Sequence, residues 1–313
     1  MASSGVAQTL GVDIFPSSTS EDEEHVDRTV VLFGKTGVGK SALGNAIAGR
    51  FKGDLFEESS NPQSETRETP TEVVTLEFEG KQYRIRIVDT NGFSDTELPE
   101  EEVLMMLADL ANTCTGGIHH VFFVTKDRFV SADQEAFKVM TDKILRPEVL
   151  PYVTVVRTNS LFRHLDDPSK AEEYKSEMVR NIPSLVRIRD FVLVNNPDIG
   201  EHGGLEGRQR THDKFLSFIV RSGTGSFYPP GFAEVRENVS PLYSEIAELD
   251  RQSERMERLL QQMEAGSSEF MQSQAMLQDM RLKKKNKSKD IKDKVLFGLQ
   301  VAGAIAPLAI AFL

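Results

Sequence analysis

Residues 34–41 of the chain read GKTGVGKS and directly follow the apolar run TVVLF. This spacing is typical of a loop that binds nucleotide phosphates, because its glycines let successive backbone N–H groups face phosphate oxygens. A helix starting at Lys40 would add its positive N-terminal end. We expect Lys40 to reach the β- and γ-phosphates and Ser41 to bind Mg²⁺. The nucleotide contacts predicted in this loop are Gly34, Lys35, Thr36, Gly37, Val38, Gly39, Lys40, Ser41 and Ala42.

A second candidate motif, IVDTNG at residues 87–92, closes another apolar run. Asp89 ends this run, so it is placed to orient Mg²⁺ through water. Gly92 could donate its backbone N–H to the γ-phosphate, which would couple the following loop to the state of the nucleotide. The D-x-x-G pattern is weak alone, and its position about fifty residues after the first motif strengthens it.

The polar stretch between the two motifs, residues 59–72, has no strand pattern and suits a mobile switch. Thr66 is the candidate second hydroxyl ligand of Mg²⁺. Ser64 and Thr69 are alternatives, because the stretch offers several hydroxyl groups.

Several elements must hold these motifs in place. Short apolar runs alternate with amphipathic stretches from Arg28 onward, which predicts βαβ units. The expected fold is an α/β P-loop NTPase fold, in which a mostly parallel sheet and the helices on its two faces form three layers. A hairpin with its turn at Gly80 and Lys81 is expected at one sheet edge. A long C-terminal helix and a hydrophobic tail are expected to follow.

Composition limits the class of protein. The 313 residues have room for one nucleotide domain with appendages, and a net charge of −11 argues against a protein that coats nucleic acid. Cys114 is the one cysteine, so no intramolecular disulfide can form, and a cytosolic setting is the default. We interpret residues 1–27 as a disordered acidic arm, either simply solvated or phosphorylated.

The predicted nucleotide domain spans residues 28–222, and a Gly/Pro-rich linker follows at residues 223–234. Residues 235–294 are expected to form a long amphipathic helix that ends in a basic run. Its apolar stripe could pair with another chain as a coiled coil or pack back on the nucleotide domain. The stripe residues are Leu242, Ile246, Leu249, Met256, Leu260, Met263 and Phe270, with Ser253 and Ser267 among them.

Residues 295–313 are uncharged and follow the basic run of residues 281–294. Nineteen helical residues reach about 28 Å, close to the hydrocarbon thickness of about 30 Å. We therefore expect a C-terminal tail anchor on the cytosolic face of an intracellular membrane, with the lysines at the lipid surface. The alternative is a helix buried in the domain or in an oligomer.

Three segments together resemble the GIMAP family, GTPases of immunity-associated proteins with an AIG-type G domain, related to septins and chloroplast import-receptor GTPases. They are VVLFGKTGVGKSALGNAIAG, IVDTNGFSDT and GIHHVFFVTKDRFVSADQEAF. The resemblance covers residues 28–221. It implies that the nucleotide is GTP or GDP with Mg²⁺, that G domains form nucleotide-dependent dimers, and that membrane tails occur in several members.

The chain also departs from this family pattern. Asn91 stands where the family usually has proline. The family usually recognises guanine with an acidic side chain after the strand that precedes Thr158, but residues 157–161 read RTNSL and contain no acid. Guanine preference therefore depends on the resemblance. Thr158 and Asn195 are the candidate contacts on this side, and either Asn195 or Asn196 could meet guanine O6. The alternative is that the paired asparagines form a turn.

Phe93 follows the second motif where Ras-like enzymes have a glutamine, so intrinsic hydrolysis should be slow. Arg128 is the candidate catalytic residue besides Lys40, as an arginine finger supplied across a homodimer. Alternatively, Arg128 caps a helix or pairs with Asp133.

Two functions remain open, a dimer-activated slow GTPase at a membrane and a nucleotide-gated scaffold that hardly hydrolyses GTP. An ATP-using P-loop enzyme is a third possibility. His119 and His120 begin a predicted buried strand, and we interpret them as packing residues rather than metal ligands.

Overall fold

The computed structural model describes residues 25–51, 55–58, 69–93, 99–201, 203–223, 225–263 and 265–303. The chain divides into two compact units. The first, called here the sheet unit, is formed by Met1–Leu98 and Cys114–Pro229. The second, called the helical unit, is formed by Pro99–Thr113 and Pro230–Leu313. The predicted arm at residues 1–27 lies mostly outside the described residues.

The sheet unit contains six strands in the order β2-β3-β1-β4-β5-β6. Only β2 runs antiparallel to its neighbour, so the predicted mostly parallel sheet is confirmed. Because β1 lies in the middle, the loop after it opens at the sheet edge where the parallel strands end. The strands are β1 (Val26–Phe33), β2 (Thr71–Phe78), β3 (Lys81–Asp89), β4 (His120–Lys126), β5 (Val153–Thr158) and β6 (Asp190–Leu193).

The predicted edge hairpin is formed by β2 and β3, with its turn one residue earlier than expected. Phe78 pairs with Lys81, so the turn residues are Glu79 and Gly80. Both have positive φ, 50° and 75°, as a two-residue turn of the I′ type requires.

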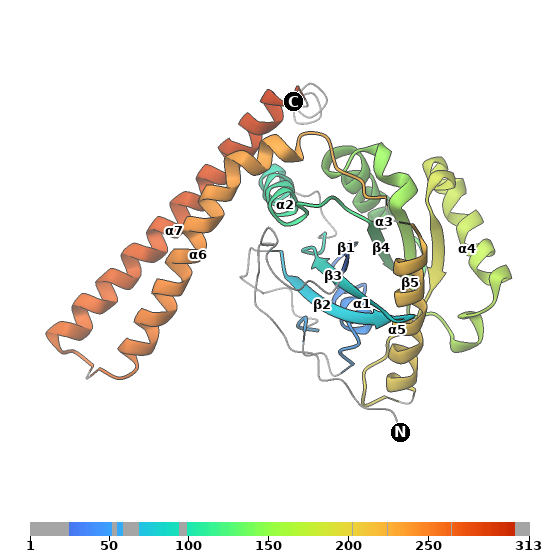
Figure 1. Cartoon of the computed structure of the whole chain (residues 1–313), viewed down its shortest axis with the longest axis horizontal. Coiled ribbons are helices and arrows are strands. Elements are labelled where there is room, and N and C mark those ends of the chain that lie inside the picture. The colour runs from blue at the N-terminus through green and yellow to red at the C-terminus, as the bar shows by residue number, and fades with distance from the viewer. Residues whose placement is uncertain are drawn as a thin grey trace. The chain divides into compact units, whose positions relative to one another are not determined.

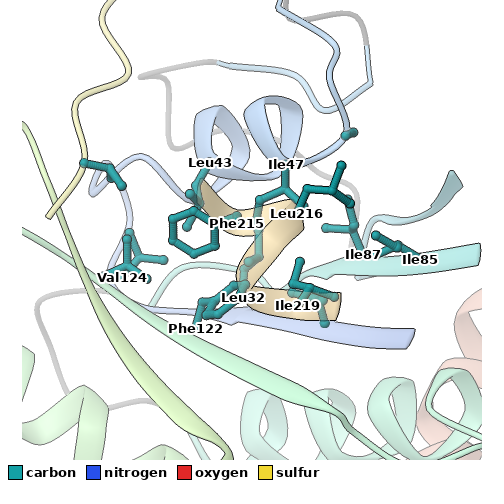
Figure 2. Close-up of a cluster of buried hydrophobic side chains, with 14 of the residues drawn as sticks. Leu32, Leu43, Ile47, Ile85, Ile87, Phe122, Val124, Phe215, Leu216 and Ile219 are labelled. Atoms are coloured by element: carbon teal, nitrogen blue, oxygen red, sulfur yellow. The ribbon is translucent and has the colours of Figure 1, made fainter. Parts of the chain in front are cut away.

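Helices cover both faces of the sheet. Phe122 and Phe123 alternate along β4, so their side chains point to opposite faces. Phe122 meets Phe215 edge to face at 4.8 Å, and Phe123 meets Phe137 at 5.1 Å. Figure 2 shows the first of these contacts inside the cluster of Leu32, Leu43, Ile47, Ile87 and Ile219. The α-helices are α1 (Lys40–Ile47), α3 (Ser131–Lys138), α4 (Pro168–Asn181) and α5 (Gly204–Arg221). A short π-helix lies at Val139–Ile144, and short 3-10 helices lie at Pro147–Tyr152, Phe162–His164 and Pro183–Arg187.

The stretch predicted as a linker contributes to the sheet unit before the next helix begins. Ile118 and Phe227 exchange two backbone hydrogen bonds of 2.7 Å each. The linker expected at residues 223–234 is thus shorter in the structure, because α6 begins at Phe232.

The helical unit consists of α2 (Glu100–Thr113), α6 (Phe232–Leu260) and α7 (Ser268–Val301). α6 and α7 lie side by side as an antiparallel pair (Figure 1). Tyr243 of α6 donates a hydrogen bond to Asp109 of α2, and Ser240 donates to Asn112 at 2.8 Å. The helix that follows the second motif therefore packs with the C-terminal helices.

The single long helix expected over residues 235–294 is broken in the structure. The chain reverses between Leu260 and Ser268, with Gly266 at a φ of 87°. Ser267 is the N-cap of α7, accepting a hydrogen bond from the Phe270 N–H at 3.1 Å. α6 consequently packs against α7 of the same chain, a partner not expected from the sequence. It also packs against α2, which lies within the nucleotide domain predicted at residues 28–222.

The basic run lies on α7, and many of its cations meet acids of the helical unit. Lys284 binds Asp250 at 2.7 Å and Arg281 binds Glu257 at 2.8 Å. The further pairs are Lys287 with Glu245, Lys292 with Glu101, and Lys283 with Asp279. The basic run thus helps to align helices, although exposed pairs of this kind stabilise a protein little.

The predicted tail anchor, residues 295–313, lies partly outside the described residues. Its first residues continue α7, with Val295 and Leu299 buried and Leu296 and Phe297 exposed. A Cβ added to Gly298 would lie 2.8 Å from the Val235 Cα, so α6 and α7 approach closely here. Within the described part of the chain, no helix is both long and apolar enough to cross a membrane.

Candidate functional site

The loop between β1 and α1 has the backbone shape that its glycines predict. Gly34 has a φ of 146°, and a Cβ there would lie 2.3 Å from the Val124 carbonyl oxygen. Gly37 and Gly39 also have positive φ, 76° and 91°. The N–H groups at the start of α1 have no partner within the helix, so Lys40, Ser41 and Ala42 can present theirs to an anion.

Lys40 lies over this loop rather than in solvent. Its ammonium donates to the carbonyl oxygens of Gly34 at 3.1 Å and Lys35 at 2.9 Å. The side chain is 7% exposed, and desolvation by burial lowers the pKa of Lys40 to about 8, against the opposing effect of Asp89. The site therefore holds a cation close to where the sequence predicts phosphates.

The pKa of Lys40 predicts how stability changes with pH. Between about pH 8 and pH 10.5, Lys40 holds its proton in the unfolded chain but loses it in the folded chain. The free energy of unfolding therefore rises with pH through this window. Below it, the penalty for burying the ammonium is present in full. Across this window, we expect the unfolding free energy of the wild type to rise by up to about 3 kcal/mol relative to that of Lys40→Met. Denaturant unfolding of both proteins measures this, and a constant difference contradicts it.

Ser41 and Asp89 come together beside the loop. The Ser41 hydroxyl donates to Asp89 Oδ2 at 2.7 Å, although the residues belong to different elements, α1 and β3. Asp89 Oδ1 is buried and has no hydrogen-bond partner within the described part of the chain. Burial raises the pKa of Asp89, and Lys40 and Ser41 oppose that rise.

These groups fit a magnesium ion. Mg²⁺ prefers a few hard oxygen ligands, keeps several waters and also binds nucleotide phosphates. A hydroxyl beside a buried carboxylate with an unpaired oxygen provides such ligands, so Ser41 and Asp89 would hold Mg²⁺, which would supply charge neutralisation of the phosphates. Among the residues that the structure describes, no group of three or more His, Cys, Asp or Glu side chains forms another candidate metal site.

The second motif contacts the phosphate loop directly. The Thr36 N–H donates to the Phe93 carbonyl at 3.1 Å, and the Phe93 N–H donates to the Gly34 carbonyl at 3.2 Å. A Cβ on Gly92 would lie 2.6 Å from the Thr36 Cα, so only glycine allows this approach. Thr36, predicted as a phosphate donor, thus already uses its N–H.

Phe93 is a core residue. It is 1% exposed and stacks on Phe33 with ring centroids 6.0 Å apart. It has no group that could orient an attacking water, as the sequence indicated.

The predicted first switch is described only at its ends. Thr66 and Ser64 lie outside the described residues. Thr69 is described, and its carbonyl accepts a hydrogen bond from the Thr71 hydroxyl at 3.2 Å. The choice of a second hydroxyl ligand among these three residues stays a prediction.

On the side predicted to hold the base, Thr158 supports the phosphate loop. Its buried hydroxyl donates to the Val38 carbonyl at 2.7 Å. Asn159 donates to Asp127 at 2.9 Å. Leu161 is 54% exposed and offers no acceptor for a base. The structure therefore places Thr158 behind the phosphate loop, where its hydroxyl stabilises the loop instead of facing a ligand.

The two asparagines predicted near the base differ. Asn195 is half-buried and follows Val194, whose carbonyl accepts a hydrogen bond from the Ser160 N–H at 3.1 Å. Both polar atoms of the Asn196 carboxamide are buried with no hydrogen-bond partner among the described residues. Asn196, the alternative to Asn195, is thus the one with an unsatisfied donor and acceptor.

Arg128 lies at a cavity of about 530 Å³ next to the phosphate loop. It is exposed and makes no hydrogen bond or ion pair to another described residue. Asp133 instead accepts a hydrogen bond from the Val130 N–H at 3.0 Å and lies 3.6 Å from the Lys35 ammonium. The alternative in which Arg128 pairs with Asp133 is therefore not what the structure shows. The cavity is lined by Lys35, Thr36, Gly37, Val38, Lys126, Asp127, Arg128, Val130 and Asp133.

The two histidines pack inside the sheet unit, away from the phosphate loop. The Thr29 N–H donates to His119 Nδ1 at 3.0 Å, and the Arg189 guanidinium lies 3.0 Å from His120 Nδ1. Burial is the main cause that lowers the pKa of His119 to about 4 and that of His120 to about 3. Both side chains are therefore neutral at physiological pH and serve packing, as interpreted from the sequence.

Arg208 and Glu58 lie near the site but belong to no sequence motif. Arg208 of α5 makes two hydrogen bonds of 2.6 Å to Glu58, which precedes the predicted first switch. The one signal in the sequence is that Arg208 falls on the helical stripe of Thr211, Phe215 and Ile219, where a buried apolar residue would be expected.

Comparison with known proteins gives a match to a family model and several relatives. The model described as the AIG1 family matches residues 28–209, more than half of the chain. Immune-associated nucleotide-binding protein 7 of Arabidopsis thaliana is 30% identical over 131 residues, 41% of this chain and 40% of that protein. Immune-associated nucleotide-binding protein 9 of the same plant is 24% identical over 71% of this chain and 64% of that protein. The chain thus spans less than two thirds of the length of these relatives.

Solved structures that align with part of the chain include a dimerization-deficient mutant of Toc33 from Arabidopsis thaliana. It aligns with a TM-score of 0.43 and 18% identity, over 60% of this chain and 84% of that chain. A structure titled for the importance of dimerization in the GTPase activity of the chloroplast translocon components atToc33 and psToc159 aligns with a TM-score of 0.45 and 18% identity. It covers 65% of this chain and 87% of that chain.

Proposed function

The chain belongs to the AIG1 family, and we propose that it is a GTP-binding switch protein whose slow hydrolysis is stimulated when two sheet units pair. The observation that carries the proposal is the pair of Ser41 and Asp89, 2.7 Å apart beside the phosphate loop, with one buried carboxylate oxygen unsatisfied. A metal-assisted phosphate site explains why this oxygen is buried without a partner, since burying a polar atom unpaired is costly.

The contact between the two motifs supports a switch. The Thr36 N–H can donate either to the Phe93 carbonyl or to a phosphate oxygen, but not fully to both. A γ-phosphate that takes this N–H would release Phe93, and Phe93 directly follows Gly92. The presence of the third phosphate would then change the position of the second motif, as in other nucleotide switches.

Hydrolysis by a single chain is expected to be slow. Phe93 has no polar side-chain group for the attacking water. Lys40 is the cation that lies over the loop in the part of the chain that the structure describes. An arginine supplied by a second copy would add the missing charge. Arg128 is suited to this role because it is exposed, lies beside the loop and is not engaged by another described residue.

The proposed recognition of the nucleotide base uses an amide in place of an acidic side chain. With Leu161 in place of an acid, the Asn196 carboxamide could take its role, since its N–H₂ can donate to guanine O6 and its oxygen can accept from guanine N1–H. Rotation of the amide would reverse this pattern and suit adenine. Selectivity for guanine therefore depends on how the loop fixes Asn196.

Equilibrium binding of fluorescent GTP and ATP analogues, with and without Mg²⁺, tests the proposed function. We expect GTP to displace the guanine probe while ATP does so at least ten-fold less effectively, which corresponds to about 1.4 kcal/mol. Asp89→Asn should remove most of the dependence on Mg²⁺, whereas Asp142→Asn, on another element, should not. Equal affinity for ATP would make the chain an ATP-using P-loop protein, and no binding of either would refute the proposal. Tight GTP binding without turnover would favour the nucleotide-gated scaffold.

We also propose that the C-terminal segment attaches the protein to the cytosolic face of a membrane. The motivating observation is that the exposed side of the end of α7 is apolar at Leu296, Phe297 and Val301 and continues into uncharged residues. Burying these side chains in lipid would remove their apolar surface from water. If the segment were to span the bilayer from Val295, Val295 and Leu299 would have to leave their buried positions.

Removal of residues 295–313 tests membrane attachment. We expect the full chain to sediment with membranes after carbonate extraction and the truncated chain to stay in the supernatant. A second truncation that removes only residues 304–313 separates the described helix end from the rest. The proposed anchor would be contradicted if the chain without residues 295–313 still sedimented with membranes, or if the full chain stayed in the supernatant.

A further inference from the structure

We propose that Arg208 is a positioning residue that ties the base-side loop, residues 194–198, to the switch-entry segment, residues 55–58. Through this tie, binding of the base and the anchoring of the first switch depend on one guanidinium. The inference rests on the proposed nucleotide function and adds a coupling inside that site.

Arg208 is held from two directions. The side chain is 2% exposed, and its two terminal nitrogens each donate to a different oxygen of Glu58 at 2.6 Å. Its third nitrogen, Nε, donates to the Pro197 carbonyl at 3.0 Å. The planar guanidinium presents these donors in a fixed fork, so a shift of either partner strains the bonds to the other.

Glu58 is in turn fastened to α1. The Asn45 Nδ2 group donates to Glu58 Oε1 at 2.7 Å and to the Phe56 carbonyl at 2.9 Å, while the Phe56 N–H donates to Asn45 Oδ1 at 2.8 Å. Asn45 is fully buried and lies one helical turn after Ser41. The switch-entry segment is thus fixed to the helix that carries the candidate magnesium ligand.

The charges of the network are matched. Burial alone would raise the pKa of Glu58, but the hydrogen bonds from Arg208 and Asn45 outweigh burial and hold it below its ordinary value. Glu58 is therefore ionised at neutral pH and balances the buried guanidinium. Removing Glu58 would leave the buried Arg208 guanidinium with the exposed Asp198 carboxylate, 3.9 Å away, as its remaining acidic partner among the described residues. Folded proteins tolerate such a poorly balanced buried charge badly.

The location of the three anchored points argues for a role beyond stability. Pro197 directly follows Asn196, whose unsatisfied carboxamide is the candidate base contact. Glu58 precedes the stretch that contains Thr66, and Asn45 belongs to the helix of Lys40 and Ser41. A single, partly buried ion pair thus joins the base side, the phosphate side and the switch entry.

Arg208→Met, Glu58→Gln and the double variant of the full chain test the coupling. Arg208→Met keeps much of the apolar stem, and Glu58→Gln keeps the shape and one acceptor. We expect each single change to speed dissociation of a fluorescent guanine nucleotide by about ten-fold or more, with the double variant no faster than the faster single one. Arg208→Lys, which keeps the charge but loses the fork, should dissociate nucleotide at an intermediate rate.

Arg210→Met is the matched control. Arg210 lies on the same helix but is exposed, and its bond to Asp166 is 3.4 Å long. We expect its nucleotide dissociation rate to equal that of the wild type.

A readout without nucleotide covers variants that fold poorly. Amide hydrogen exchange of the Glu58→Gln chain should increase at residues 194–198 as well as at residues 55–58. Unchanged dissociation rates in folded variants, or exchange that increases only at residues 55–58, would overturn the coupling. Failure of the wild type to bind any nucleotide would refute the proposed function instead.

Discussion

Replacing Lys40 with methionine is expected to lower affinity for nucleoside triphosphate and turnover by at least about 10² to 10³-fold, the usual effect of losing one donor that faces developing charge. The ammonium is already held over the loop by the Gly34 and Lys35 carbonyls, so it needs little rearrangement to meet a phosphate. Methionine keeps a similar apolar stem, so the fold should persist. Isothermal titration with Mg²⁺-GTP and single-turnover hydrolysis measure the two effects.

Lys81→Met is the control for this change, because Lys81 is an exposed lysine at the start of β3. It should bind GTP like the wild type. If Lys40→Met bound GTP as tightly as Lys81→Met does, the loop at residues 34–41 would not be the phosphate site.

Replacing Arg128 with alanine is expected to remove the stimulation of hydrolysis that appears at high protein concentration, by about 10³-fold or more. The affinity for nucleotide should change little, because Arg128 is exposed and lies at the cavity rather than over the phosphate loop. Arg128→Lys should recover only part of the rate, since a lysine cannot bind two phosphate oxygens in the planar manner of an arginine. Multiple-turnover GTP hydrolysis over a range of concentrations measures these rates.

The control is Arg180→Ala, an exposed arginine of α4 whose hydrogen bond is to the Ser176 carbonyl of its own helix. A mixing experiment adds a sharper criterion. An Arg128→Ala chain that retains Lys40 should be stimulated by a Lys40→Met chain that retains Arg128. Unchanged turnover of Arg128→Ala while dimers persist would contradict a trans-acting arginine.

Much of the sheet unit could be predicted because its information is local. The apolar run before Gly34 and the apolar runs that end at Asp89 and Thr125 each formed the expected strand. The meeting of Ser41 with Asp89 also followed, because the ends of neighbouring parallel strands lie at one edge of the sheet. The turn of the β2–β3 hairpin was shifted by one residue, since alternating patterns locate strands better than turns.

The helical unit was predicted poorly for a physical reason. The periodic stripe continues past Leu260, so periodicity alone indicated one helix, whereas the break is decided by Gly266 and the Ser267 cap. Which surface covers an apolar stripe is also a long-range property. Here α6 packs against α7. Leu277 and Ile291 of α7 are buried, but their spacing says nothing about their partner.

The network around Arg208 could not be predicted for a similar reason. Its partner Glu58 is 150 residues away, and neither residue belongs to a motif. The sequence places Arg208 on the buried stripe of a helix, which indicates a buried charge that needs a partner. The identity of that partner requires the fold.

The most direct test of the central claim is turnover per molecule of Mg²⁺-GTP, with Mg²⁺-ATP in parallel, as the concentration of the full chain is raised over about three orders of magnitude. The proposed switch predicts GTP turnover per molecule that is slow when the protein is dilute, rises with concentration and is not matched by ATP. Turnover that stays flat across the whole range despite tight GTP binding, or a preference for ATP, would contradict it.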